Sequence, residues 1–211
     1  MTIVQNYKNI RSQIDLINSK VKLIVVSKGR DIDSINELIK LGHLDFGENR
    51  VQETISKWNG VVEQNKNINL HLVGKLQSNK AKDAHKIFNY IHSLDNQKLA
   101  INFSQIESSN SSRKLKYFVQ INIGNEPQKG GIDQYSASDF IDFSKNDLKL
   151  NIVGLMCLPP VDHNPTDFFL KLKELAKVNK LPELSMGMSD DYEEAINCGS
   201  TFVRIGSAIF R

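Results

Sequence analysis

The sequence contains few cysteines and prolines and no long apolar run. Its 211 residues include only 2 Cys, 5 Pro and 1 Trp. Two cysteines, Cys157 and Cys198, are too few for a disulfide framework, and neither has a Cys or His neighbour at metal-ligand spacing. These features exclude a disulfide-rich scaffold and a zinc-finger type of site. We interpret both cysteines as small buried hydrophobic residues.

The absence of long apolar segments also bears on location. Residues 1–20 mix Gln, Asn, Lys and Asp with apolar residues and lack the apolar stretch of a signal peptide. No later segment approaches the length and hydrophobicity of a membrane span. We therefore expect a cytoplasmic protein with no membrane partner.

The composition is that of an ordinary globular protein. Hydrophobic residues make up 40% and charged residues 24%, which excludes disorder and collagen-like repeats. A formal net charge of +3 gives no general argument for a nucleic-acid partner. In the densest basic run, residues 75–86, no aromatic residues interleave with the charges to stack bases, so we interpret it as a solvated helix face. The sequence leaves open whether this surface binds a partner protein.

Apolar runs of strand length alternate with segments of helical period, as expected of βα units in a parallel sheet. The predicted strands number eight: 23–27, 43–46, 70–73, 90–92, 117–121, 152–155, 183–185 and 201–204. Predicted helices include 4–17, 32–41 and 168–178, and 122–133 is the longest irregular loop. No linker divides the chain, so we predict one α/β domain over residues 1–211, a (β/α)8 TIM barrel. A doubly wound open sheet is the alternative.

Lys28 follows the apolar run 23–27, so it lies where the first predicted strand meets the rim of the barrel. Reactive groups of such barrels sit at the C-terminal ends of strands and in the loops just after them. A lysine at a strand end is usually a solvated flank. If its amine is nucleophilic instead, it can form an imine with an aldehyde.

Two late segments could bind an anion. The segment 184–191 runs from a strand into a helix and contains Ser189, and the segment 203–210 places Gly206 and Ser207 in the same position. Backbone N–H groups at such turns bind phosphate, and the loops after the seventh and eighth strands of these barrels frequently do so. A structural alternative for the first segment is a helix cap, with Asp190 and Glu193 forming a capping box.

Arg204 lies within the last predicted strand. An arginine buried at the top of a barrel needs a polar partner, and a heteroaromatic nitrogen or a carboxylate would serve.

Six ordered motifs together resemble the pyridoxal 5′-phosphate (PLP) homeostasis proteins, the family of the YggS-type and PROSC-type proteins. They are VSK (26–28), FGENRVQE (46–53), HLVGKLQSNK (71–80), GLM (154–156), MGMSDD (186–191) and VRIGSAIF (203–210). The resemblance covers nearly the whole chain. It implies a barrel similar to the N-terminal domain of alanine racemase, with PLP as the cofactor.

The resemblance also implies roles for individual residues. Lys28 matches the lysine that holds PLP as a Schiff base, while Ser189, Gly206 and Ser207 match the phosphate-binding positions. Arg204 would face the pyridine nitrogen and leave it unprotonated, which makes PLP a weaker electron sink. Three further positions match rim motifs and are candidate pocket residues, although close packing in the core would explain each of them as well: Asn49, His71 and Met156.

A few positions depart from the family pattern. Gly29 follows the lysine where many relatives carry threonine, and Gly130 stands where a polar residue is more usual. The first change could loosen the loop behind the cofactor. The change at Gly29 removes no proposed cofactor contact.

The first of three hypotheses, and the favoured one, is a binder without catalytic turnover that holds or delivers PLP and so affects vitamin B6 balance, with apo PLP-dependent enzymes as acceptors. We expect a monomer, since the racemase dimer depends on a β-domain for which this chain has no room.

The second hypothesis is a PLP-dependent amino-acid racemase. It would need an acid/base group on each face of the substrate, and a barrel tyrosine, Tyr192 or Tyr135, would have to replace the one that the β-domain supplies. The third is an enzyme whose lysine forms an imine with a phosphorylated metabolite and which uses no PLP. That hypothesis does not account for Arg204.

Overall fold

Eight parallel strands close into a barrel in the computed structural model, which describes residues 2–109 and 113–211. Hydrogen-bonded neighbours follow the order β4-β3-β2-β1-β9-β8-β7-β5, and the pairing of β4 with β5 closes the ring. The single-domain TIM barrel fold predicted from the sequence is therefore confirmed, and the open sheet is excluded. The barrel strands are β1 Lys22–Val26, β2 Asp45–Glu48, β3 Asn69–Leu72, β4 Tyr90–Leu94, β5 Lys116–Asn122, β7 Ile152–Cys157, β8 Glu183–Ser185 and β9 Phe202–Ile205.

A further two-residue strand, β6 (Ile132–Asp133), lies in the segment 122–133 that the sequence predicted to be irregular throughout. It pairs in parallel with the end of β5, where Ile132 stands opposite Ile121. This part of the prediction was wrong because the strand is too short to show an alternating pattern.

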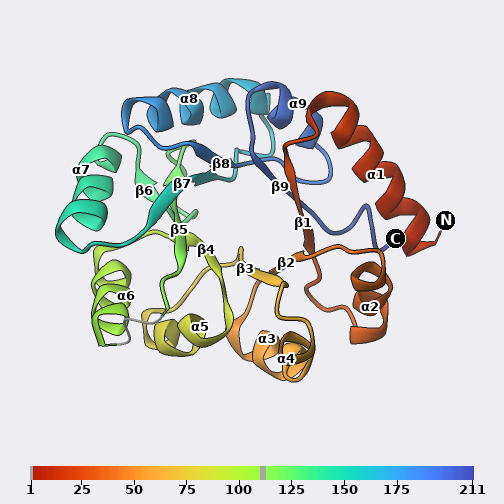
Figure 1. Ribbon diagram of the computed structural model, residues 1–211. Helices are drawn as coiled ribbons and strands as arrows, with labels where there is room; N and C mark the ends of the chain where they lie inside the picture. Colours follow the sequence, from red (N-terminus) through yellow and green to blue (C-terminus); the bar gives the residue numbers. More distant parts are fainter. Residues whose placement is uncertain (1, 110–112) are drawn as a thin grey trace.

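The helices form a ring around the barrel (Figure 1). Helix α1 begins with a capping box, in which Thr2 Oγ1 accepts from the N–H of Gln5 and the Gln5 side chain accepts from the N–H of Thr2. The helical segments are α1 Ile3–Asn18, α2 Ile32–Lys40, α3 Val51–Trp58, α4 Val61–Gln64, η1 Ser78–Lys80, α5 Ala81–Ile87, α6 Gln97–Ser109, α7 Ala137–Asp142, η2 Phe143–Asp147, α8 Pro165–Val178 and α9 Tyr192–Asn197.

Strand β2 starts two residues later than predicted, at Asp45 rather than at His43. His43 belongs to the turn that follows α2, where its N–H donates to Leu38 O. Both ends of β2 are acidic, Asp45 and Glu48, so the apolar pattern does not mark the bounds of this strand. Its register is set by the pairing of residues 45–48 with β3.

Apolar side chains fill both the space between barrel and helices and the barrel itself. The larger cluster joins the outward faces of the strands to the helices. The smaller cluster lies inside the barrel and consists of Ile24, Tyr90, Phe118, Met156 and Phe202, all at most 5% exposed. Because these side chains fill the barrel interior, the barrel is a packed core and not a pore.

The two ends of the chain meet on the outside of the barrel (Figure 1), where Asn6 Nδ2 on α1 donates to Ile209 O and to Arg211 O. Across residues 2–109 and 113–211, no helix combines the length and apolar character needed to cross a membrane.

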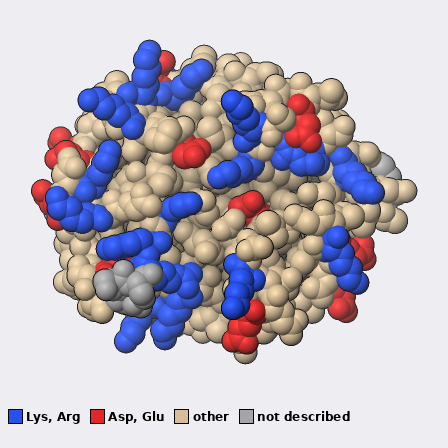
Figure 2. All heavy atoms as spheres, viewed as in Figure 1, with Lys and Arg blue, Asp and Glu red and all other residues tan. Residues whose placement is uncertain are grey.

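The basic run 75–86 is only partly the solvated face that the sequence predicted. Lys75, Lys82 and Lys86 are exposed, but His85 is buried on α5 and its Nε2 lies 3.3 Å from Arg113 O. In the face drawn in Figure 2, acidic side chains lie between the basic ones. Mixed charges of this kind are typical of an ordinary solvated surface.

Candidate functional site

A pocket of about 450 Å³ opens at the C-terminal ends of the strands. The strands β1 and β9 contribute residues to it, together with the segments that directly follow β1, β2, β3, β7, β8 and β9. This is the end of the barrel at which ligands bind in folds of this type. The lining residues are Val26, Lys28, Arg30, Asn49, Val73, Leu158, Met188, Ser189, Asp190, Arg204, Gly206 and Ser207.

The pocket brings together most of the residues predicted to form the site. Lys28, Asn49, Ser189, Arg204, Gly206 and Ser207 all line it, although they come from segments as far apart in sequence as β1 and β9.

Lys28 lies in a tight turn at the end of β1. The N–H of Arg30 donates to Ser27 O at 3.1 Å, and Gly29 has φ +67°. Glycine adopts this left-handed conformation without strain, whereas a β-branched residue would be strained. The substitution of glycine for the more usual threonine thus fits the turn seen here. The Lys28 side chain is exposed and makes no hydrogen bond or ion pair with the residues that the structure describes.

Behind this turn, a buried carboxylate joins β1, β2 and α3. Glu48 is 1% exposed, and its Oε1 accepts from Ser27 Oγ at 2.7 Å and from Trp58 Nε1 at 3.1 Å. Lys57 Nζ lies 2.8 Å from the same oxygen and also donates to Ser27 O at 2.7 Å. These contacts hold the residue preceding Lys28 at a fixed place on the rim.

The loops after the neighbouring strands β8 and β9 carry two hydroxyls into the pocket. Ser189 Oγ, in the loop after β8, lies 3.0 Å from Ser207 Oγ, in the loop after β9. Between them and the barrel, Gly206 lies so close to β1 that a Cβ atom would come within 2.8 Å of Val26 O. Only glycine fits here without a shift of the main chain, so the loop that carries Ser207 packs directly against the end of β1.

The capping box proposed for Asp190 and Glu193 is not formed. Helix α9 begins at Tyr192, with Asp191 in the N-cap position and no side-chain cap hydrogen bond. The Asp191 carboxylate instead accepts from the N–H of Met188 at 2.6 Å. It therefore closes the turn 188–191, which carries Ser189 into the pocket.

Arg204 is the charged group at the base of the pocket. It is 5% exposed, with Nη1 donating to Ser185 Oγ at 2.7 Å and Nη2 donating to Cys157 O at 3.0 Å. Burial lowers the pKa of this guanidinium, and Cys157 and Asp191 counteract the shift. Among the residues that the structure describes, no carboxylate forms an ion pair with Arg204. A buried cation with unused N–H groups favours a polar or anionic ligand in the pocket.

His71 and Met156 are not among the residues that line the pocket. Met156 is 1% exposed and belongs to the apolar cluster inside the barrel. His71 is fully buried, stacks on Tyr90, and makes hydrogen bonds to Asp45 and His92. For both residues the structure shows the alternative that the sequence had left open, a place in the core.

Several lining residues were not predicted. Arg30 adds a second cation to the rim and lies over the ring of Phe210 at 5.2 Å. Arg30 could have been predicted from the sequence, because it lies two residues after Lys28 in the same turn. The pocket also has an apolar part, formed by Val26, Val73 and Leu158. In the sequence, only their places near the ends of predicted strands indicate that they could line it.

Solved structures over the whole chain have the same fold. PipY of Synechococcus elongatus, solved without PLP, superposes with a TM-score of 0.90 at 33% identity, and the structure with PLP bound with a TM-score of 0.87 at 32% identity; all of both chains is covered. Alanine racemase of Clostridium difficile has a TM-score of 0.74 at 16% identity, covering 99% of this chain and 56% of that one. This last likeness shows the fold alone.

Sequence comparison places the chain in a family. The pyridoxal phosphate homeostasis protein of Pasteurella multocida is 35% identical over 227 residues, covering 100% of this chain and 97% of the relative. That of Escherichia coli is 32% identical and covers 99% of this chain. Residues 2–211 match the family described as alanine racemase, N-terminal domain. The chain therefore belongs to the alanine racemase N-terminal domain family and, within it, to the pyridoxal phosphate homeostasis proteins.

Proposed function

We propose that this protein binds PLP in the rim pocket, holds it as a Schiff base on Lys28, and serves PLP homeostasis without catalytic turnover. The observation that carries the proposal is the meeting of Lys28, Arg204 and the Ser189–Ser207 pair in one pocket. The name of its relatives and the structure of PipY with PLP bound support it.

The side chains of the pocket fit the parts of PLP. An aldehyde needs a primary amine, and Lys28 offers one that makes no hydrogen bond or ion pair with the described residues. A phosphate needs hydrogen-bond donors, which Ser189, Ser207 and the N–H groups beside Gly206 supply. A heteroaromatic ring nitrogen can accept from the N–H groups of Arg204 that Ser185 and Cys157 leave unused. When bound, PLP supplies a ring that withdraws electrons from groups attached to it.

The surroundings of Lys28 do not favour proton transfer on two faces of a substrate. The titratable lining residues are Lys28, Arg30, Asp190 and Arg204, and within the described chain no tyrosine or histidine lines the pocket. Tyr192 Oη donates to Gln13 Oε1 at 2.7 Å on the helix side, and Tyr135 is 83% exposed. Since neither tyrosine lines the pocket, the racemase hypothesis lacks the tyrosine that it would need as its second acid/base group.

A binder of this kind would keep reactive PLP bound until an acceptor takes it, and apo PLP-dependent enzymes are the acceptors we propose. One barrel contains all the lining residues, so a monomer would suffice for binding. Gel filtration of the PLP-loaded protein would measure its oligomeric state.

The decisive experiment is the visible absorption spectrum of protein loaded with PLP, followed by borohydride reduction and peptide mass spectrometry. We expect a visible band that borohydride removes, with the adduct on the peptide that contains Lys28. Lys28→Ala should lose the band and keep the thermal midpoint, because an exposed rim lysine contributes little to the core. Lys75→Ala is the matched control and should behave as wild type. An adduct found mainly on Lys75 or Lys80 would overturn the assignment, and no band at all would favour an imine with another phosphorylated compound.

A further inference from the structure

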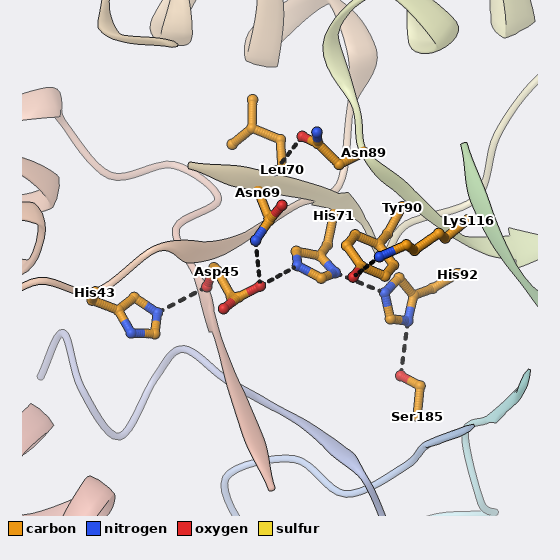
Figure 3. A network of polar contacts seen from close by, with 10 residues as sticks. All are labelled: His43, Asp45, Asn69, Leu70, His71, Asn89, Tyr90, His92, Lys116 and Ser185. Atoms are coloured by element: carbon orange, nitrogen blue, oxygen red, sulfur yellow. Dashed lines mark hydrogen bonds and ion pairs between the residues drawn. The ribbon is translucent and has the colours of Figure 1, made fainter. Parts of the chain in front are cut away.

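A continuous chain of hydrogen bonds runs through the barrel interior from Arg204 in the pocket to Asp45 at the start of β2. Figure 3 shows its part from Ser185 to Asp45. Arg204 Nη1 donates to Ser185 Oγ at 2.7 Å, and Ser185 Oγ lies 2.8 Å from His92 Nδ1. His92 Nε2 lies 3.0 Å from His71 Nδ1, and His71 Nε2 lies 3.0 Å from Asp45 Oδ1. The three middle residues are completely buried, whereas the Asp45 side chain is 24% exposed.

The Asp45 end of this chain sets the direction of every hydrogen bond in it. An ionised carboxylate can only accept, so His71 donates from Nε2 to Asp45. A neutral His71 then has no proton on Nδ1 and accepts there from His92 Nε2. A neutral His92 accepts in turn at Nδ1 from the O–H of Ser185, whose oxygen accepts from Arg204.

The opposite direction cannot be satisfied by neutral rings. If His71 donated from Nδ1 to His92, its bare Nε2 would face a carboxylate oxygen that also accepts from Asn69 Nδ2 at 3.2 Å. That arrangement needs an additional proton on His71 or on Asp45. Burial lowers the pKa of His71 and of His92, and the charges of Lys22, Lys116 and Arg204 act in the same direction. Asp45 raises the pKa of His71, but less than burial lowers it, so both imidazoles are held neutral.

We propose that Asp45, His71, His92 and Ser185 form one directed hydrogen-bond relay that fixes the Arg204 guanidinium in the pocket, with Ser185 as the positioning residue in direct contact with it. Ser185 accepts from Nη1 of Arg204, Cys157 O accepts from Nη2, and the remaining N–H groups of the guanidinium are left for a ligand. It also connects a buried cation to a carboxylate that Arg204 does not touch. This inference rests on the proposed function only where it concerns PLP.

The direction of the relay can be tested without PLP, by nitrogen-15 NMR of the histidine rings at pH 7. We expect His71 and His92 to be neutral and protonated at Nε2, with Nδ1 unprotonated; the single variants His71→Gln and His92→Gln assign the signals. Asp45→Asn keeps an oxygen that can accept from His71 and should preserve this pattern. Asp45→Ala removes the acceptor that sets the direction and should give mixed tautomers. A proton on Nδ1 of either ring in the wild type would overturn the proposal.

Equilibrium dialysis with PLP then tests the effect on the pocket. Ser185→Ala removes one contact of Arg204 and should raise the Kd for PLP about tenfold, which corresponds to a single charge-assisted hydrogen bond. Ser144→Ala is the control, because Ser144 is a buried serine outside the relay, and it should leave the Kd unchanged. Equal Kd values for these two variants would refute the positioning role. A wild type that does not retain PLP would refute the proposed function instead, while the NMR result would still decide the direction of the relay.

Discussion

Ser189 Oγ and Ser207 Oγ lie 3.0 Å apart, so the loops after β8 and β9 present two hydroxyls side by side at one edge of the pocket. Lys28 and Arg204 line the same pocket, as does Arg30. A ligand with an anionic group at one end and an electrophile elsewhere would satisfy these groups together.

Replacing Ser207 by Asp should weaken PLP retention far more than replacing it by Ala. The aspartate puts a negative charge next to Ser189, where the phosphate is proposed to bind, whereas the alanine variant keeps the backbone N–H groups. We expect about tenfold weaker retention for Ser207→Ala and a much larger loss for Ser207→Asp, measured by equilibrium dialysis. Equal retention by both variants would mean that the phosphate binds elsewhere.

Replacing Lys57 by Met should destabilise the protein by about 3 kcal/mol, because it leaves the buried Glu48 carboxylate without its cation. Adding Glu48→Gln should recover part of this loss, since the amide oxygen can still accept from Ser27 and Trp58. Urea denaturation of the single and double variants measures both effects. The interpretation fails if the double variant is less stable than Lys57→Met alone.

The stability of the protein should fall on acidification, and His43 should contribute to this fall. Burial lowers the pKa of His43 from 6.5 to about 4, against the opposing effect of Asp45. Because the unfolded chain then binds more protons than the folded one, stability decreases as the pH falls from 6.5 towards 4.

The variant His43→Gln lacks this titrating group. Over the same pH range, its free energy of unfolding should therefore fall by about 3 kcal/mol less than that of the wild type. The measurement is the urea midpoint at several pH values between 7 and 4, with His163→Gln as the control at a position where no such burial occurs. His71 and His92 also have lowered pKa values, so a residual pH dependence is expected. An unchanged slope in His43→Gln would contradict the prediction.

We expect no appreciable racemase, transaminase or decarboxylase turnover. No tyrosine or histidine is among the described lining residues of the pocket to act as the second acid/base group, and Arg204 should keep the ring nitrogen unprotonated. The measurement is exchange of the α-proton of L- and D-alanine in deuterated buffer, with Lys28→Ala run in parallel to subtract the chemistry of free PLP. Exchange on the order of 1 per second or faster in the wild type would show that the protein is an enzyme.

The order of strands and helices could be predicted well from the sequence, and the ends of individual elements less well. Strand β1 carries a continuous apolar run, and β5 carries one interrupted only by Gln120, because helices cover these strands on one side and the side chains of other strands cover them on the other. The bounds of strand β2 were predicted wrongly because both of its ends are charged. Asp45 makes a polar contact inside the barrel, and Glu48 makes one between the barrel and α3. The two-residue strand β6 has too few residues for any pattern.

The sequence by itself determined the fold class, the family motifs and the loops that could bind an anion, because these depend on local patterns of apolar, glycine and hydroxyl residues. Only the tertiary structure decided which of the candidate residues share a pocket. Asn49, His71 and Met156 all stand near strand ends in the sequence. In the structure, Asn49 lines the pocket, whereas His71 and Met156 do not. The reason is geometric: successive side chains of a strand point to opposite faces, and inward-facing residues occupy different layers of the barrel. Whether a side chain reaches the rim or a lower layer depends on the stagger of all the strands together.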